Sequence, residues 1–206
     1  MPDSDAEPPS TGALPETVMS GAEPLQESAA QLNILFEQGD AAVPDGLTET
    51  FMRQCCQTAL SGQSLLSLSE VATIELSIQL LDKQAIRELN HQYRDKDRAT
   101  NVLSFAAELP LMMGMPDADE ESPAGGLLVL GDLVLCPEVV ADEAQQQGKA
   151  LLDHWAHMLV HGTLHLCGHD HEVEQEAQLM EASEIRLLSG LGIPNPYASE
   201  NAVNGQ

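Results

Sequence analysis

The stretch HGTLHLCGHDH, residues 161–171, holds four of the seven histidines in the chain, and His157 precedes it by one helical turn. His161 and His165 are four residues apart, so on an α-helix their imidazoles lie on one face and can bind one ion. A glycine directly follows the first of them. The stretch therefore predicts a helix that carries two metal ligands.

The third ligand must come from chain that has left the helix axis. His157 and His165 are eight residues apart, which is about 12 Å along a helix with a rise of about 1.5 Å per residue. Two bonds of about 2 Å to one metal cannot bridge that distance. Gly168 is placed to end the helix with positive φ, and His171 follows three residues later. The spacing predicts a metal held by His161, His165 and His171.

The expected ion is one Zn²⁺ per chain, because imidazole suits zinc, and Ni²⁺ and Cu²⁺ are alternatives. Three protein ligands leave the fourth position open, which is the arrangement of catalytic rather than structural zinc sites. Three neutral imidazoles also leave the charge of the ion uncompensated. This lowers the pKa of bound water towards about 7 and suits an anionic substrate such as a phosphodiester.

Four residues near these ligands have more than one possible role. Asp170 is either a ligand or, as favoured here, a residue that orients a ligand imidazole or helps to move a proton. His157 is either an orienting residue of the same kind or a core histidine with satisfied hydrogen bonds. Cys167 offers a competing soft ligand, and His169 offers a rival nitrogen.

The spacing H-x3-H-x5-H, with a glycine between the last two histidines, matches the longer pattern of zinc peptidases. One position differs, because the glutamate that acts as general base in those peptidases is Gly162 here. The spacing therefore indicates a metal, whereas the substitution argues against proteolysis.

The chain is strongly acidic, but its few basic residues are clustered. The formal net charge of −25 argues against extensive nucleic-acid binding, since proteins that neutralise many phosphates carry a surplus of Lys and Arg. Four of the eight basic residues nevertheless fall within twelve positions, at Arg87, Arg94, Lys96 and Arg98. In isolation YRDKDRATNVLSF, residues 93–105, would be a solvated charged loop. Beside a metal, Arg94 could hold a phosphate through two parallel hydrogen bonds and stabilise a transition state.

Length and composition indicate one globular domain. With 206 residues, of which 43% are apolar, the chain can bury an ordinary core. The four cysteines form no CxxC pair, which is typical of reduced thiols in a cytoplasmic protein. No signal peptide is indicated, and no apolar run approaches the roughly 20 residues that span a bilayer. We therefore expect a cytoplasmic protein with neither a membrane nor a DNA partner.

Hydrophobic periodicity and capping residues predict an α+β fold: a small mixed sheet of about four strands packed with about five helices. Residues 1–29 are predicted to be a disordered acidic arm, 30–193 the domain, and 194–206 a flexible tail. The segment 108–124 is predicted to be an exposed loop or insertion. The expected strands are 31–37, 73–81, 101–106 and 126–137, with a bend at Gly131. The expected helices are 46–60, 83–94, 138–147, 150–166 and 172–189. Thr48 and Asp82 are expected to cap the first two helices, and the last is expected to end at Gly190.

Three segments together closely resemble the YbeY family of bacterial rRNA-maturation endoribonucleases. They are HGTLHLCGHDH with the preceding HWAHMLV, NHQYRDKDRATNVLSF, and LGDLVLCPE, and the resemblance covers roughly residues 70–190 in the same order and spacing. It implies a zincin-like single domain, a metal held by His161, His165 and His171, and an arginine at Arg94 that is important for RNA cleavage.

The resemblance also implies an activity: metal-dependent, single-strand-specific RNA cleavage in 16S rRNA 3′-end maturation and in ribosome quality control. Catalysis is then expected from Arg94 and His165, with Lys96 and Arg98 guiding precursors of the small ribosomal subunit. A ribosomal protein or a ribosome-associated GTPase is expected to supply targeting. The chain departs from the family at His169, where Tyr is common, and at Ala99, where Pro is common.

Two other functions stay open. One is a metallohydrolase of peptides or small esters, for which Gly162 is the discriminating residue. The other is a non-catalytic ribosome-assembly factor with a structural zinc, in which His169 or Asp170 would close the fourth coordination position.

Overall fold

The computed structural model describes residues 30–39, 41–61, 71–107, 112–113, 126–169 and 173–198. The predicted acidic arm, most of the 108–124 segment and the end of the predicted tail lie outside the described residues. Among the described helices, none combines the length and the hydrophobicity that crossing a bilayer requires.

The secondary-structure elements follow the predicted order. They are β1 (Gln31–Gln38), α1 (Glu49–Ser61), β2 (Val71–Leu80), α2 (Lys83–Arg94), β3 (Val102–Ala106), β4 (Met112–Met113), β5 (Gly126–Leu135), α3 (Pro137–Gln147), α4 (Leu151–Leu166) and α5 (Glu174–Gly190). The predicted α+β class, with four main strands and five helices, is confirmed, and the two-residue β4 is an addition to it.

Capping side chains begin the first two helices where the sequence predicts. The Thr48 hydroxyl accepts a hydrogen bond from the backbone N–H of Phe51 at 3.1 Å, and the Asp82 carboxylate accepts one from Ala85 at 2.8 Å. The prediction that the last helix ends with Gly190 as its cap is wrong. Gly190 is still helical, and the residue with positive φ is Gly192, at 77°. The helix does end at Gly190, but its cap is Leu191 and the chain reverses at Gly192.

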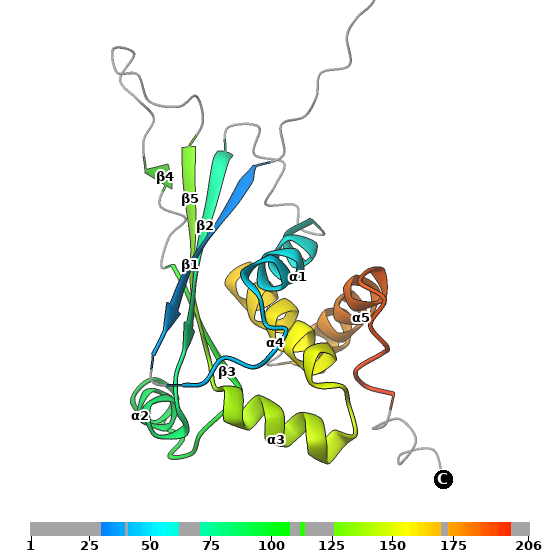
Figure 1. The fold of residues 1–206 in the computed structure, drawn as a ribbon. Helices are drawn as coiled ribbons and strands as arrows, with labels where there is room; N and C mark the ends of the chain where they lie inside the picture. The colour runs from blue at the N-terminus through cyan, green and yellow to red at the C-terminus, as the bar shows by residue number, and fades with distance from the viewer. Residues whose placement is uncertain are drawn as a thin grey trace, which may run out of the picture.

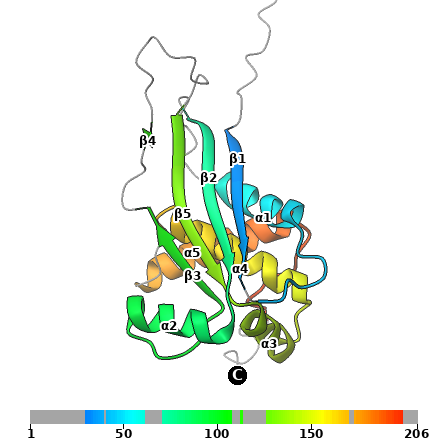
Figure 2. The same cartoon turned by 60° about the vertical axis from the view of Figure 1, so that its left-hand side comes forward.

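The sheet has the order β1-β2-β5-β3, with β4 paired to β5 (Figure 1, Figure 2). β1, β2 and β5 run parallel, and β3 runs antiparallel to β5 at the edge. The predicted bend at Gly131 is confirmed by a register shift in β5, where Glu75 pairs with Val129 and Leu76 with Gly131. A Cβ at Gly131, which has φ of +127°, would lie 2.1 Å from the carbonyl oxygen of Phe105. Only glycine fits this bulge.

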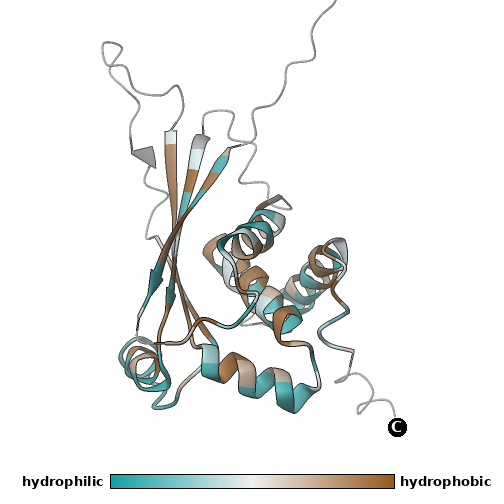
Figure 3. Cartoon of the chain, in the orientation of Figure 1, coloured by the Kyte–Doolittle hydropathy of each residue, from teal (hydrophilic) through white to brown (hydrophobic). Residues whose placement is uncertain are grey.

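Helices cover both faces of the sheet. α1, α4 and α5 lie together on one face, and α2 lies on the other (Figure 1). Strand alternation explains the division, because successive side chains of a strand point to opposite faces. In β5, Leu133 and Leu135 join the core beneath α1 and α4, whereas Val134 joins Ile86 of α2 in the smaller cluster. Hydrophilic and hydrophobic residues alternate along α2 and α3, as expected of helices with one exposed face (Figure 3).

Candidate metal centre

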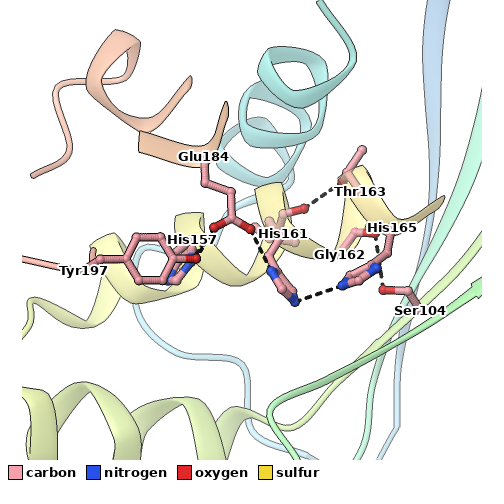
Figure 4. Close-up of polar contacts among 9 residues, drawn as sticks. Ser104, His157, His161, Gly162, Thr163, His165, Glu184 and Tyr197 are labelled. Atoms are coloured by element: carbon pink, nitrogen blue, oxygen red, sulfur yellow. Dashed lines mark hydrogen bonds and ion pairs between the residues drawn. The ribbon is translucent and has the colours of Figure 1, made fainter. Parts of the chain in front are cut away.

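α4 is the central helix of the larger core, and Gly162 lets it approach the sheet closely. Eleven of its sixteen residues are buried. A Cβ at Gly162 would lie 2.8 Å from Leu133 Cδ2 and 3.3 Å from Ser104 Oγ. The hydroxyl of Ser104 donates to the Gly162 carbonyl at 3.2 Å, which ties α4 to the edge strand β3 (Figure 4). A larger side chain, such as the glutamate of the peptidase pattern, does not fit this contact.

The helix ends where the sequence predicts. Gly168 has φ of +87°, the Gly168 N–H donates to His165 O at 3.0 Å, and the His169 N–H donates to Leu164 O at 3.1 Å. This pair of bonds is the Schellman arrangement that closes a helix with a left-handed glycine. The chain therefore leaves the helix axis directly after His161 and His165, as it must if a later residue is to bind the same ion.

His161 and His165 face one another on α4. Their Nε2 atoms are 3.2 Å apart, and both side chains are partly exposed (Figure 4). Two nitrogen ligands at about 2.0–2.1 Å from a tetrahedral zinc lie about 3.3–3.4 Å apart. The two imidazoles are thus already spaced to bind one ion through their Nε2 atoms.

Glu184 of α5 fixes the orientation of His161. His161 Nδ1 lies 2.7 Å from Glu184 Oε1, so Nδ1–H donates to the carboxylate and the Nε2 lone pair faces His165 (Figure 4). Burial of the Glu184 carboxyl raises its pKa, but hydrogen bonds from His157 and His161 outweigh burial and lower that pKa to about 2. The carboxylate is therefore charged and acts as a permanent acceptor.

His157 and Tyr197 complete the surroundings of this carboxylate. His157 Nε2 lies 3.4 Å from Glu184 Oε2 and 3.2 Å from the Tyr197 hydroxyl, which itself donates to Glu184 Oε2. Burial lowers the pKa of His157, against the opposing effect of Glu184, so its imidazole is neutral. His157 thus shares the Glu184 acceptor with His161, and its two predicted roles, orienting residue or core histidine, stay predictions.

The histidines and Glu184 offer two ways of binding a metal. One atom from each of His157, His161 and Glu184 lies within 4.8 Å of the others, so this buried group could hold an ion. The side chains of His157 and Glu184 are only 9% and 1% exposed, however, whereas that of His161 is 25% exposed. A metal on the Nε2 side of His161 and His165 would therefore be more accessible to a substrate than one held between His157 and Glu184.

Four further residues were predicted near the metal, and the structure describes two of them, Cys167 and His169. His171 and Asp170 lie outside the described residues, so their predicted roles as ligand and orienting residue stay predictions. Cys167 caps α4, and burial raises the pKa of its thiol to about 11, which makes it a poor thiolate ligand. His169 takes part in the helix-ending turn through its backbone.

The predicted RNA-binding cations lie on the other side of β3. Arg94 ends α2, and the exposed Lys96 and Arg98 follow in the next loop. Neighbouring residues of β3 divide the two regions: Phe105 contacts Tyr93 of α2 at a ring-centroid distance of 5.0 Å, whereas Ser104 faces α4. The cations and the histidines therefore border the same edge strand from opposite faces.

Asn90 and Arg87 give the cationic loop a defined shape. The buried Asn90 donates from its side-chain Nδ2 to the backbone carbonyl of Arg98 at 2.8 Å, and its own backbone carbonyl accepts from the Lys96 N–H at 3.2 Å. Arg87 holds Asp97 through two bonds of 2.6 and 2.8 Å. The guanidinium of Arg87 is thus engaged by Asp97 of the loop, whereas Arg94 and Lys96 are exposed.

Sequence reasoning did not identify Glu184 or Tyr197. A signal for Glu184 did exist, because it falls on the same face of α5 as the buried Met180, Leu187 and Leu188. An acidic residue within an apolar stripe indicates a buried partner. No comparable periodic signal indicates that Tyr197 contacts His157, forty residues earlier in the chain.

Comparison with known proteins identifies relatives over most of the chain. The family model described as "Endoribonuclease YbeY" matches residues 33–192. A protein named "Endoribonuclease YbeY" from Pseudomonas putida (strain W619) is 46% identical over 162 residues, which cover 78% of this chain and 89% of that protein. Proteins of the same name from Halorhodospira halophila and Alkalilimnicola ehrlichii are 51% and 52% identical, over 60% and 59% of this chain and 74% and 68% of their own lengths. The solution structure of TM1509 from Thermotoga maritima is 23% identical, with a TM-score of 0.43 over 84% of this chain and 99% of that one.

Proposed function

This chain belongs to the YbeY family of endoribonucleases, and from this we propose that it cleaves RNA at a metal centre built on α4. The observation that carries the proposal is the 3.2 Å separation of the Nε2 atoms of His161 and His165. Glu184 supports it by holding Nδ1–H of His161, since a carboxylate behind a ligand imidazole is the usual partner of a metal-binding histidine.

The proposed centre consists of His161, His165 and His171 around one Zn²⁺. A zinc ion held there would supply Lewis-acid chemistry, polarising a phosphoryl oxygen and favouring nucleophile formation near neutral pH. Glu184 and His157 keep the tautomer and the orientation of His161. Asp170 is assigned to orientation or proton movement rather than to metal binding.

Arg94, Lys96 and Arg98 are proposed to bind the RNA backbone. Because the loop and the histidines border β3 from opposite faces, a single strand that crosses the edge of the sheet can meet both. Arg94 would hold a phosphate through its guanidinium and stabilise the charge that develops during cleavage. A duplex would have to be opened to follow this path, which favours single-stranded substrates.

The proposed biological substrate is rRNA, at the 3′ end of the 16S species in precursors of the small subunit. With a net charge of −25, the protein alone should bind RNA weakly. We therefore propose that a ribosomal protein or a ribosome-associated GTPase brings it to its substrate. The proposed substrate and partners imply that the protein acts in the cytoplasm. The relatives do not favour the two alternatives, peptide hydrolysis and a non-catalytic role, and the close contact at Gly162 leaves no room for the peptidase base.

The test is RNA cleavage with matched variants. Purified wild-type protein, assayed for zinc content, is given a defined fragment that spans the 3′ end of precursor 16S rRNA. His165→Ala and Arg94→Glu should abolish cleavage, and the first should also release zinc. His91→Ala and Arg186→Glu, at exposed positions on α2 and α5, are the controls and should keep both properties. Cleavage that survives His165→Ala and Arg94→Glu would refute the proposal, because it would come from a contaminating nuclease.

A further inference from the structure

A hollow of about 240 Å³ opens beside the proposed metal centre, and the proposed cleavage leaves its interior without a role. His161 of α4 forms one side of the hollow. Because His161 is also a proposed metal ligand, a base in the hollow would lie next to a phosphate bound at the metal. The other lining residues come from α5 and from the segment after it: Ala177, Met180, Glu181, Glu184 and Tyr197. Sites for drug-sized ligands measure about 300–1,000 Å³, so this hollow suits one small group.

The lining favours a nucleobase over the RNA backbone. Glu181 and Glu184 both border the hollow, and two carboxylates repel a phosphate. Met180, which is 2% exposed, and Ala177 provide an apolar wall. Tyr197 adds an aromatic ring, set at 83° to the ring of His157. Apolar and aromatic surface with a few polar groups is how proteins hold single unstacked RNA bases.

Among the described residues that line the hollow, Glu181 has a carboxylate that takes part in no hydrogen bond or ion pair with another described residue. The Glu184 carboxylate already accepts from His157, His161 and Tyr197, whereas Glu181 lines the hollow and is exposed. A carboxylate offers two acceptor oxygens side by side. Guanine alone among the four RNA bases presents two adjacent donors on its Watson–Crick edge, the N1–H and the N2 amine, and parallel donors of this kind match a carboxylate.

We propose that this hollow is a subsite for an unstacked guanine next to the scissile phosphate, with Glu181 as the specificity-determining residue. The inference rests on the proposed RNA cleavage, because the bound phosphate at the metal is what brings a base to the hollow. It assigns to α5 a second role besides the orientation of His161.

The first experiment maps cleavage of a single-stranded RNA of randomised sequence. Wild-type protein should enrich guanine at one nucleotide flanking the cut, by at least about fivefold, since a bidentate contact discriminates between bases to that extent. Glu181→Gln replaces two acceptors by one acceptor and one donor. The preference for guanine should therefore be lost, because each of the four bases presents a donor beside an acceptor that an amide can pair with. Glu176→Gln, at an exposed position on the same helix outside the hollow, should keep the guanine preference.

The second experiment measures binding without cleavage. Zinc-loaded full-length protein is titrated with guanosine 5′-monophosphate and adenosine 5′-monophosphate by calorimetry. Wild type and Glu176→Gln should bind the guanine nucleotide at least about fivefold more tightly, and Glu181→Gln should not. Equal base frequencies around the cut, or a guanine preference unchanged in Glu181→Gln, would overturn the subsite while leaving RNA cleavage intact. Selective nucleotide binding by a protein that cleaves no RNA would instead overturn the proposed function alone.

Discussion

The contact at Gly162 predicts a measurable difference between two glycine-to-alanine substitutions. In Gly162→Ala the new methyl group would lie 2.8 Å from Cδ2 of Leu133, a residue that is 0% exposed and therefore cannot swing into solvent. Such overpacking costs about 1–3 kcal/mol. The better helix propensity of alanine offsets about 1 kcal/mol of this cost. The free energy of unfolding should therefore fall by about 0–2 kcal/mol.

Gly190→Ala is the matched control, because Gly190 is also helical but a Cβ there would meet nothing within 4 Å. This variant should be more stable than wild type by up to about 1 kcal/mol. The two variants should then differ by about 1–3 kcal/mol, which corresponds to about 2–12 °C in Tm for a chain of this size. Urea and thermal unfolding measure the difference directly. Equal stabilisation of both variants would refute the close approach of α4 to β5.

The same contact links packing to the metal centre. Gly162 is adjacent to His161, so any outward shift of α4 also moves a proposed ligand. Gly162→Ala should therefore cleave RNA more slowly than its loss of stability alone explains, whereas Gly190→Ala should retain wild-type activity. Gly162→Glu, which installs the residue of the peptidase pattern, should fail to fold rather than gain proteolytic activity.

Three further predictions concern Glu184, Asn90 and the buried cysteines of α1. Glu184→Gln should weaken zinc affinity about 10–100-fold in a chelator competition, because the amide is a poorer partner for a ligand imidazole, while Glu176→Gln should have no effect. Asn90→Ala leaves the Arg98 carbonyl without its donor and should cost about 1–3 kcal/mol of stability. It should also raise the KM for RNA with zinc content unchanged, and an unchanged KM would argue against the loop as an RNA contact. Burial raises the pKa of the Cys55 and Cys56 thiols to about 12 and about 11, so both stay protonated at pH 8 and should resist alkylation until urea unfolds the protein. Rapid labelling of the folded protein at either position would contradict this burial.

Local signals made much of this fold predictable from the sequence. Thr48 and Asp82 begin helices through hydrogen bonds to residues three positions later, and Gly168 ends one through residues of the last turn. The bulge at Gly131 could be expected for the same reason, since a glycine inside an apolar strand has few other uses. In each case the residue and its partner lie close together in the chain or on one strand pair.

The less predictable features depend on contacts between distant segments. Glu184 meets His161 only because α5 packs on α4, and Tyr197 meets His157 only because the segment after α5 returns to that helix. The position of Arg94 relative to the histidines likewise follows from the sheet order, which places β3 at the edge between them. β4 exists only as a partner of β5, so its two residues carry no periodicity of their own.

The carboxylate of Glu184 also sets an order of events during protein synthesis. The histidines of α4 leave the ribosome before the helix that orients His161, and before the tyrosine that shares its acceptor. A nascent chain that has been translated only as far as α4 carries both imidazoles without their organising partner. The metal-binding orientation of His161 is therefore complete only after α5 has packed on α4.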